Sequence, residues 1–303
     1  MERFLEVKPI PFFSSRSLEC LSVVESIVSS RLGVEVAKGF VSQLRELPLV
    51  STADHHAVID HPYWVNADII TALPFGSANR SLRYIPVFSF ASISLNNASA
   101  HPRGIVLHGN GAAAAECGCV VPFFPDKMKM SVAYAVRAWS GEDIAHAKED
   151  IYAKVKKGEW DALHADELSA YVERTFGEED ILSMPDFCSQ ITKVNYRLWP
   201  TLFHDSLGVT DTEQGSFVSV EIESIVRELF VSIYCRDTSS LIHRACFDAE
   251  IRRVLEKYMD GLPGSYDSKE GTGSYLFWGL SDKQHRVALR FLNGSLVSSD
   301  GAF

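Results

Sequence analysis

The stretch around which we expect this chain to be organised is Ser51-Thr52-Ala53-Asp54-His55-His56-Ala57-Val58-Ile59-Asp60-His61-Pro62. It brings three imidazoles and two carboxylates together just after an apolar entry, Leu47-Pro48-Leu49-Val50. Two aromatic residues, Tyr63 and Trp64, and an apolar run follow at once, which argues against a solvated surface segment. We therefore predict that residues 51–62 form the rim of a functional site.

Segments of different character lie on either side of this stretch. Upstream, apolar residues recur at helical spacing in residues 17–33 and again in residues 34–47, which predicts two amphipathic helices. Downstream, short runs rich in aromatic and branched apolar residues predict β-strands. The strand candidates are residues 84–95, 105–108, 120–124 and 130–139.

The second half of the chain is mainly helical in pattern and returns to strand-like composition near its end. Helices are expected at residues 144–155, 165–176, 181–203, 220–235 and 247–259, and strands at residues 275–278 and 287–292. These patterns predict an α+β fold with a central, mostly antiparallel or mixed β part, flanking helices and a helical insertion at about 141–260. We expect residues 1–303 to form a single α+β domain, with residues 141–260 as a candidate helical subdomain.

Composition and charge restrict the class of protein. The 303 residues carry a formal net charge of −10, with 46% hydrophobic and 22% charged residues, which is typical of a globular chain. The acidic balance argues against nucleic acid as a partner. No long apolar run or signal-peptide h-region is present, and the six cysteines are scattered, which predicts a cytoplasmic protein without a membrane partner. A small-molecule substrate is the expected partner, and these features are compatible with a homo-oligomer.

Metal ligation is the sharpest interpretation of the polar residues in residues 51–62. Imidazole and carboxylate groups are ligands that zinc, iron and manganese accept, and catalytic zinc sites use three such groups with one open position. We expect Asp54, His56 and His61 to hold a divalent metal ion (zinc, iron or manganese), while His55 or Asp60 transfers protons. A metal-bound water would then attack the substrate. The first hypothesis is therefore a metal-dependent enzyme, most simply a hydrolase acting on a small polar substrate.

A metal-free enzyme is the second hypothesis. Cys117 and Cys119 follow a glycine turn and a run of small residues, where a thiolate can act as an acyl-accepting nucleophile with a histidine as its base. The base would be His55, His56 or His108, and His108 is a catalytic candidate because it ends a short predicted strand. Adjacent histidines also cap turns and bind buried carbonyls, so a purely structural role stays open.

A non-catalytic small-molecule-binding protein is the third hypothesis. Trp64, Trp278 and the glycine-containing loop before Trp278 are suited to enclosing a small molecule. Around the segment at residues 51–62, Asn97, Arg103, Thr272 and Trp278 are the expected substrate-binding residues, because they lie at strand ends and glycine-flanked loops.

The expected site also makes a geometric prediction. One short segment cannot close a pocket, so its partners must come from distant positions. We expect His56 or His61 to lie within about 10 Å of Arg103, His108 or Trp278, the ordinary dimension of a small-molecule pocket.

Overall fold

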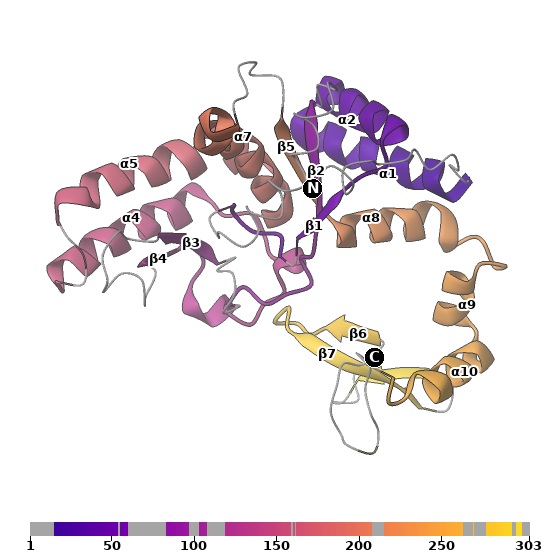
Figure 1. Ribbon diagram of the computed structural model, residues 1–303. Coiled ribbons are helices and arrows are strands. Elements are labelled where there is room, and N and C mark those ends of the chain that lie inside the picture. Colours follow the sequence, from indigo (N-terminus) through magenta and orange to yellow (C-terminus); the bar gives the residue numbers. More distant parts are fainter. Residues whose placement is uncertain are drawn as a thin grey trace. The chain divides into compact units, whose positions relative to one another are not determined.

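The computed structural model describes residues 15–53, 55–59, 83–96, 103–107, 119–158, 160, 162–207, 215–262, 269, 277–292 and 295–298. Internal contacts divide the chain into two compact units, Met1–Ile225 and Val226–Phe303. The strands of the described residues form one parallel and two antiparallel sheets, and helices flank them (Figure 1). The predicted α+β fold with a mixed β part and flanking helices is confirmed.

A parallel sheet lies in the first unit. Its strands are β1 (Ser51–Ala53), β2 (Tyr84–Ser89) and β5 (Ser216–Glu221), in the order β1-β2-β5. Val87 of β2 pairs with Ser51 on one side and with Ser219 on the other. Every residue of β5 is buried, as expected for a parallel strand that is covered on both faces. Because the three strands run in the same direction, their carboxyl ends meet at one edge.

Three helices pack beside this sheet: α1 (Ser15–Leu32), α2 (Val34–Glu46) and α7 (Phe187–Leu207). α7 lies against β5 and α2 lies against β2 (Figure 1). The side chain of Gln43 in α2 bonds the backbone of β2, donating to Tyr84 O (2.8 Å) and accepting from Tyr84 N (3.0 Å). Gly39 permits this approach, since a Cβ atom there would lie 2.6 Å from Tyr84 Oη. The two N-terminal helices predicted from apolar spacing are confirmed.

A second layer of the same unit surrounds a cluster of aromatic side chains. Its elements are β3 (Gly104–Leu107), β4 (Cys119–Pro122), α4 (Gly141–Lys156) and α5 (Ala165–Phe176). The Trp139 ring centroid lies 5.5 Å from that of Phe123 and 6.1 Å from that of Phe176, and Trp139 Nε1 donates to Phe176 O (3.0 Å). The side-chain amide of Gln190 in α7 bonds both Trp139 N and Trp139 O. The aromatic core is thereby tied to the helix that covers the parallel sheet.

One predicted strand of the first unit is wrong, and one predicted helix starts at the wrong residue. Residues 130–139 form no strand; they contain the 3-10 turn η3 (Ala133–Ala135) between isolated bridges of Ser94 with Val132 and of Arg137 with Asp186. The predicted helix at residues 220–235 begins too early, because Val220 and Glu221 end β5 and α8 (Ile222–Leu229) follows directly. A strand therefore interrupts the predicted helical insertion.

Other predicted elements differ in their limits. The strand predicted for residues 84–95 ends at Ser89. The helix predicted for residues 181–203 is divided into a short α6 (Glu179–Leu182) and α7, and α7 continues through Pro200. Two further 3-10 turns are η2 (Asp126–Met128) and η4 (Ala162–His164).

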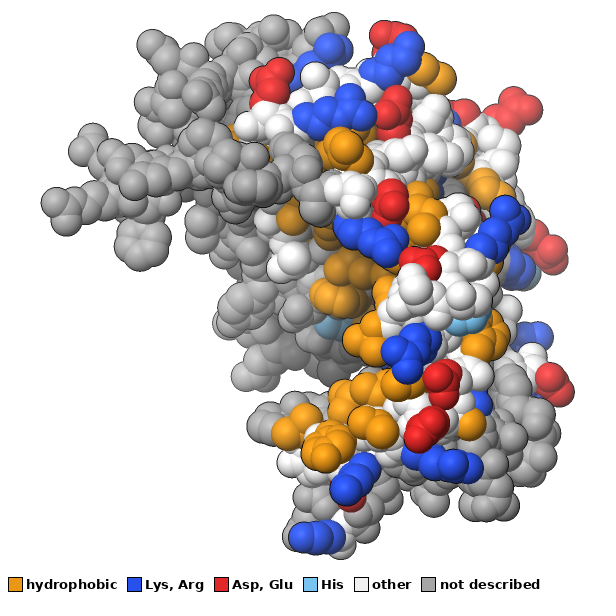
Figure 2. Space-filling model, turned by 90° about the vertical axis from the view of Figure 1, so that its right-hand side faces the viewer, with side chains coloured by type: hydrophobic (Ala, Val, Ile, Leu, Met, Phe, Trp, Pro, Cys, Tyr) orange, Lys and Arg blue, Asp and Glu red, His pale blue; other side chains and the backbone are white. Residues whose placement is uncertain are grey.

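The second unit has a thinner interior. Its elements are the π-helical turn η5 (Phe230–Tyr234), α9 (Leu241–Phe247), α10 (Ala249–Met259), β6 (Phe277–Leu280), β7 (Arg286–Leu292) and β8 (Ser295–Ser298). The three strands form an antiparallel sheet, and β8 is an element that the sequence patterns did not predict. Among the side chains described in this unit, no hydrophobic one is fully buried, whereas Leu241, Phe247 and Tyr258 are more than half exposed. Figure 2 shows one face of the molecule on which hydrophobic side chains are exposed.

Within the described residues, no helix has both the length and the apolar character that crossing a membrane requires.

Candidate functional site

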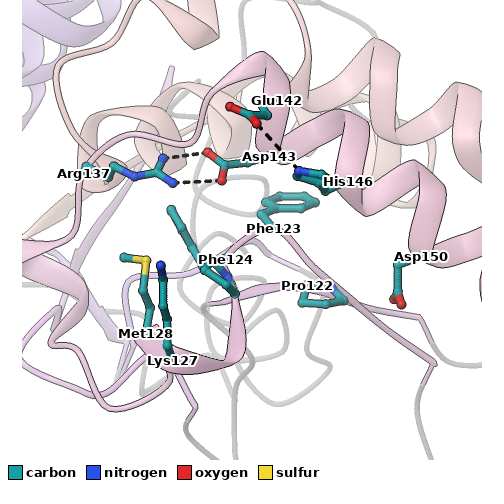
Figure 3. A pocket seen from close by; sticks show the side chains of 11 residues that line it. Pro122, Phe123, Phe124, Lys127, Met128, Arg137, Glu142, Asp143, His146 and Asp150 are labelled. Carbon is teal, nitrogen blue, oxygen red and sulfur yellow. Dashed lines mark hydrogen bonds and ion pairs between the residues drawn. The ribbon is translucent and has the colours of Figure 1, made fainter.

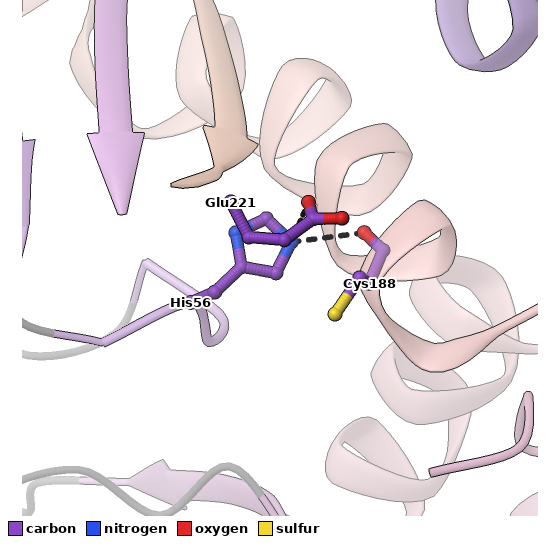
Figure 4. A group of neighbouring side chains, drawn as sticks. All are labelled: His56, Cys188 and Glu221. Carbon is purple, nitrogen blue, oxygen red and sulfur yellow. Dashed lines mark hydrogen bonds and ion pairs between the residues drawn. The ribbon is translucent and has the colours of Figure 1, made fainter. Parts of the chain in front are cut away.

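Two places in the first unit bring polar side chains together. One is a pocket beside α4 (Figure 3). The other is a buried group at the carboxyl edge of the parallel sheet, which includes His56, Cys188 and Glu221 (Figure 4). The carboxyl edge is where open parallel sheets carry their ligands, so the buried group is the stronger candidate for a reaction centre.

The ends of the three strands position this group. His56 follows β1, Ser89 is the last residue of β2 and Glu221 is the last residue of β5. The backbone of His56 is fixed next to the sheet because its N–H donates to Phe90 O (2.7 Å). Asn195 of α7 holds the next turn of the chain, accepting from Ile59 N (3.1 Å) and donating to Ala57 O (2.9 Å).

A buried ion pair anchors the group to α1. Arg31 Nη1 lies 2.5 Å from Glu221 Oε2, and Arg31 Nη2 lies 2.6 Å from Glu221 Oε1, so the contact is bidentate. Ser224 Oγ also donates to the carboxylate, and Thr192 accepts from Arg31 Nη1 (3.1 Å). Burial acts to raise the pKa of Glu221, but the hydrogen bonds and charge of Arg31 outweigh it and hold this pKa at about 2. Glu221 is therefore ionised at neutral pH.

Both ring nitrogens of His56 have partners. Nδ1 lies 2.7 Å from Ser89 Oγ, and Nε2 lies 2.9 Å from Cys188 O and 3.6 Å from Glu221 Oε2. A carbonyl oxygen only accepts, so Nε2 carries a proton in this arrangement. Burial lowers the pKa of His56 in spite of the nearby Glu221 charge, which makes the neutral ring the form expected at pH 7. Nδ1 then accepts the Ser89 hydroxyl proton.

Cys188 adds a third kind of donor atom. One ring nitrogen of His56, Cys188 Sγ and one oxygen of Glu221 all lie within 4.8 Å of one another, and all three side chains are buried. Burial raises the pKa of the Cys188 thiol well above its ordinary value, with a further contribution from the charge of Glu221. Without a bound cation the thiol stays protonated.

This donor set fits a transition-metal ion such as zinc. Nitrogen, thiolate sulfur and carboxylate oxygen are all zinc ligands. An ion would replace the Nε2 proton of His56 and the thiol proton of Cys188, and it would share Glu221 Oε2 with Arg31. Ser89 Oγ already lies against Nδ1, the position from which a partner orients a ligating imidazole.

The predicted site residues fall into two groups. Four have described side chains: His55, His56, Arg103 and Trp278. Those outside the described residues are Asp54, Asp60, His61, Trp64, Asn97, His108, Cys117 and Thr272. Cys119 begins β4, but its side chain is not described. The metal, catalytic and substrate-binding roles given to all these residues stay predictions.

Only one of the described candidates belongs to the buried group. His56 does, and His55 is buried beside it in the chain. Arg103 instead binds Asp126 at the turn η2, with Nη1 2.6 Å from Asp126 Oδ1. Trp278 lies in β6 of the second unit, with the guanidinium of Arg286 4.7 Å from its ring centroid. The 10 Å expectation stays a prediction. His61 and His108 are not described, Trp278 belongs to the other unit, and the contacts of His56 and Arg103 are with different residues.

Sequence reasoning missed Arg31, Ser89, Cys188 and Glu221. Each is an ordinary residue of a helix or strand, and none lies in the dense group of histidines and carboxylates at residues 51–62. The available signal was weak: Glu221 and Ser89 stand at the ends of apolar runs, where polar side chains reach a sheet edge.

Comparisons with known proteins give no family for this chain: no protein-family model, curated protein or solved structure matches it.

Proposed function

We propose that the protein is a metal-dependent hydrolase acting on a small polar substrate, with a divalent metal ion held by His56, Cys188 and Glu221. The observation that carries the proposal is the meeting of a ring nitrogen, a thiol and a carboxylate within 4.8 Å at the carboxyl edge of a parallel sheet. This set replaces Asp54 and His61 as ligands and retains His56.

The surrounding residues have distinct roles in this proposal. Arg31 keeps the carboxylate of Glu221 ionised, and it offsets part of the negative charge that a Cys188 thiolate adds. When Nε2 of His56 is a ligand, Nδ1 carries the ring proton and donates a hydrogen bond to Ser89 Oγ. A bound divalent ion supplies a water of lowered pKa as the nucleophile. With three protein ligands, a fourth coordination position would be open for that water.

Metal analysis of the protein purified without a histidine tag tests the proposal. We expect one zinc, iron or manganese ion per chain. The protein should hydrolyse small esters or amides, a chelator should abolish this activity, and adding the metal back should restore it. Cys188→Ser should lower both the metal content and the activity. Cys235→Ser is the matched control, because Cys235 lies in the other unit and its thiol bonds Val231 O.

Protein that holds no stoichiometric metal after purification and refolding with each of the three ions would refute the metal site. Refolding is included because the buried ligands admit an ion only when the structure opens locally.

A metal-free hydrolase is a second candidate, favoured by the 2.7 Å contact between Ser89 Oγ and His56 Nδ1. In that case Ser89 would attack a carbonyl carbon, His56 would take its proton and return it to the leaving group, and Glu221 would orient the ring. A fluorophosphonate probe distinguishes the two candidates: it would label Ser89 only in the metal-free enzyme, and Ser89→Ala would abolish the labelling.

The proposal includes a cytoplasmic location, where the Cys188 thiol would remain reduced and able to bind an ion.

A further inference from the structure

The pocket beside α4 is separate from the buried group. It lies between the end of β4, the turn η2 and the first turns of α4, and its volume is about 670 Å³ (Figure 3). That volume is within the range of sites for small organic ligands. Pro122, Phe124 and Met128 contribute an apolar surface, and charged side chains of η2 and α4 surround it.

Two of the charged side chains are already paired with each other. Arg137 Nη1 and Nη2 lie 2.6 and 2.9 Å from the two oxygens of Asp143. Asp143 also accepts from Ser140 N (2.7 Å) and Ser140 Oγ (2.8 Å). The guanidinium of Arg137 lies 5.4 Å from the Phe124 ring centroid. These contacts make the pair part of the wall, and its charges cancel.

The remaining charges are separated across the pocket. Lys127 is exposed and has no hydrogen bond or ion pair with another described residue. On α4, Glu142 lies 3.8 Å from His146 Nε2, and Asp150 pairs through one oxygen with Lys154 (2.7 Å). Figure 3 shows Lys127 on one side of the pocket and Asp150 on the opposite side. Lys127 therefore gives one side of the pocket a positive charge. On the α4 side, the negative charge comes from Glu142 and from the Asp150 oxygen that does not pair with Lys154.

We propose that this pocket binds a zwitterionic small molecule with an apolar body, of about the size of a dipeptide. Its carboxylate pairs with Lys127 and its ammonium group pairs with Asp150, with Glu142 adding negative potential on the same helix face. The apolar body covers Pro122 and Met128. This site stands independently of the proposed metal-dependent hydrolase.

Ligands with one charge match the pocket less well. An anion would gain from Lys127 but would also face the carboxylates of Glu142 and Asp150. A cation would leave Lys127 without a partner and would be repelled by it. Only a molecule with both charges at its ends pairs each side of the pocket with its opposite.

Titration calorimetry with three matched ligands tests the inference. They are leucyl-phenylalanine, its N-acetyl derivative and its C-terminal amide. The N-acetyl derivative lacks the positive charge, and the amide lacks the negative charge. We expect the free dipeptide to bind with a Kd at or below about 1 mM, and each blocked form to bind about five- to tenfold more weakly. The inference is wrong if the free dipeptide does not bind at about 10 mM, or if the blocked forms bind equally well.

Charge-removing variants assign the two ends. Lys127→Gln should abolish the preference for the free acid over the amide and leave the preference for the free amine. Asp150→Asn should do the reverse, and Glu142→Gln serves as a second variant on that side because it breaks no close ion pair. Lys157→Gln, at an exposed lysine after α4, is the control and should change neither preference. The assignment is wrong if Lys127→Gln keeps the preference for the free acid and Asp150→Asn keeps the preference for the free amine.

Discussion

At the scale of single residues, the ion pair between Arg31 and Glu221 is the most consequential contact. Both side chains are almost completely buried, with 6% and 0% of their side-chain surface exposed. A buried ion pair stabilises the folded state no more than well-packed apolar residues of similar volume would. Removing one partner is nevertheless costly, because the other charge stays buried without compensation. The rest of the group, His56 included, is built around this pair.

Glu221→Gln in metal-free protein should therefore lower the free energy of unfolding by about 3–5 kcal/mol, because Arg31 would remain buried without a counter-charge. Urea denaturation measures the change. Glu35→Gln is the control, since Glu35 forms an exposed pair with Lys38 at 3.8 Å and should leave stability unchanged. Equal effects of the two substitutions would contradict a structural role for the buried pair.

The residues of the candidate site were only partly predictable from the sequence. His56 was found because it stands in a dense group of histidines and carboxylates. Cys188 and Glu221 were not found, because their meeting with His56 depends on how α7 and β5 pack on the sheet. Local patterns carry no information on such long-range neighbours.

At the scale of elements, the start of α4 shows a local pattern that fixes a helix. Ser140 Oγ accepts from Asp143 N (3.3 Å), and Asp143 accepts from Ser140 N, which is a capping box. Arg137 then binds the capping carboxylate. The first turn of α4 thereby holds one wall of the pocket.

Ser140→Ala should lower the free energy of unfolding by about 1 kcal/mol, since it removes the acceptor for a helix N–H group. Ser140→Thr keeps a hydroxyl in place and should restore most of the loss. Thermal unfolding followed by circular dichroism measures both variants. An alanine variant as stable as the parent protein would mean that the cap contributes nothing.

The same carboxylate makes stability depend on pH. Partial burial acts to raise the pKa of Asp143, but Arg137 and Ser140 outweigh it and hold the pKa below the ordinary 3.8. A depressed folded pKa gives stability that is present above the unfolded value and is lost as the pH falls below it. In Arg137→Gln, we expect the Asp143 pKa measured by NMR to rise toward 3.8 and the loss of stability in acid to become smaller, because the unfolded-state pKa is unchanged. An unchanged pKa would contradict the pairing.

The elements were predictable where one periodicity dominates. α1 and α2 follow from regular apolar spacing, whereas the end of β5 was assigned to a helix. All six residues of β5 are buried, so the strand shows no in–out alternation, and the apolar spacing of α8 extends back into Val220. At residues 130–139, strand-like composition is overridden by tight turns that pack Val132 and Val136 into the core.

At the scale of the whole molecule, the two units differ in how much apolar surface they bury. The first contains Phe40, Trp139, Trp199 and many other buried side chains, while the described side chains of the second include no buried hydrophobic one. Local stability follows buried apolar contact. The second unit should therefore open more often.

Hydrogen exchange followed by mass spectrometry checks this expectation. Amides of α9 and α10 should exchange at least about tenfold faster than those of β2 and β5, which lie in the parallel sheet. Equal protection of α10 and β5 would show that the second unit has a core of comparable stability.

Cobalt binding is the sharpest test of a metal centre at His56, Cys188 and Glu221, because the absorption spectrum of bound cobalt depends on its ligands. Protein refolded with Co²⁺ should bind one ion per chain and show the intense near-ultraviolet charge-transfer band of a cobalt–thiolate bond. That band should disappear in Cys188→Ser and persist in Cys235→Ser. A protein that binds no cobalt, or whose thiolate band is unchanged in Cys188→Ser, would contradict a metal centre at His56, Cys188 and Glu221.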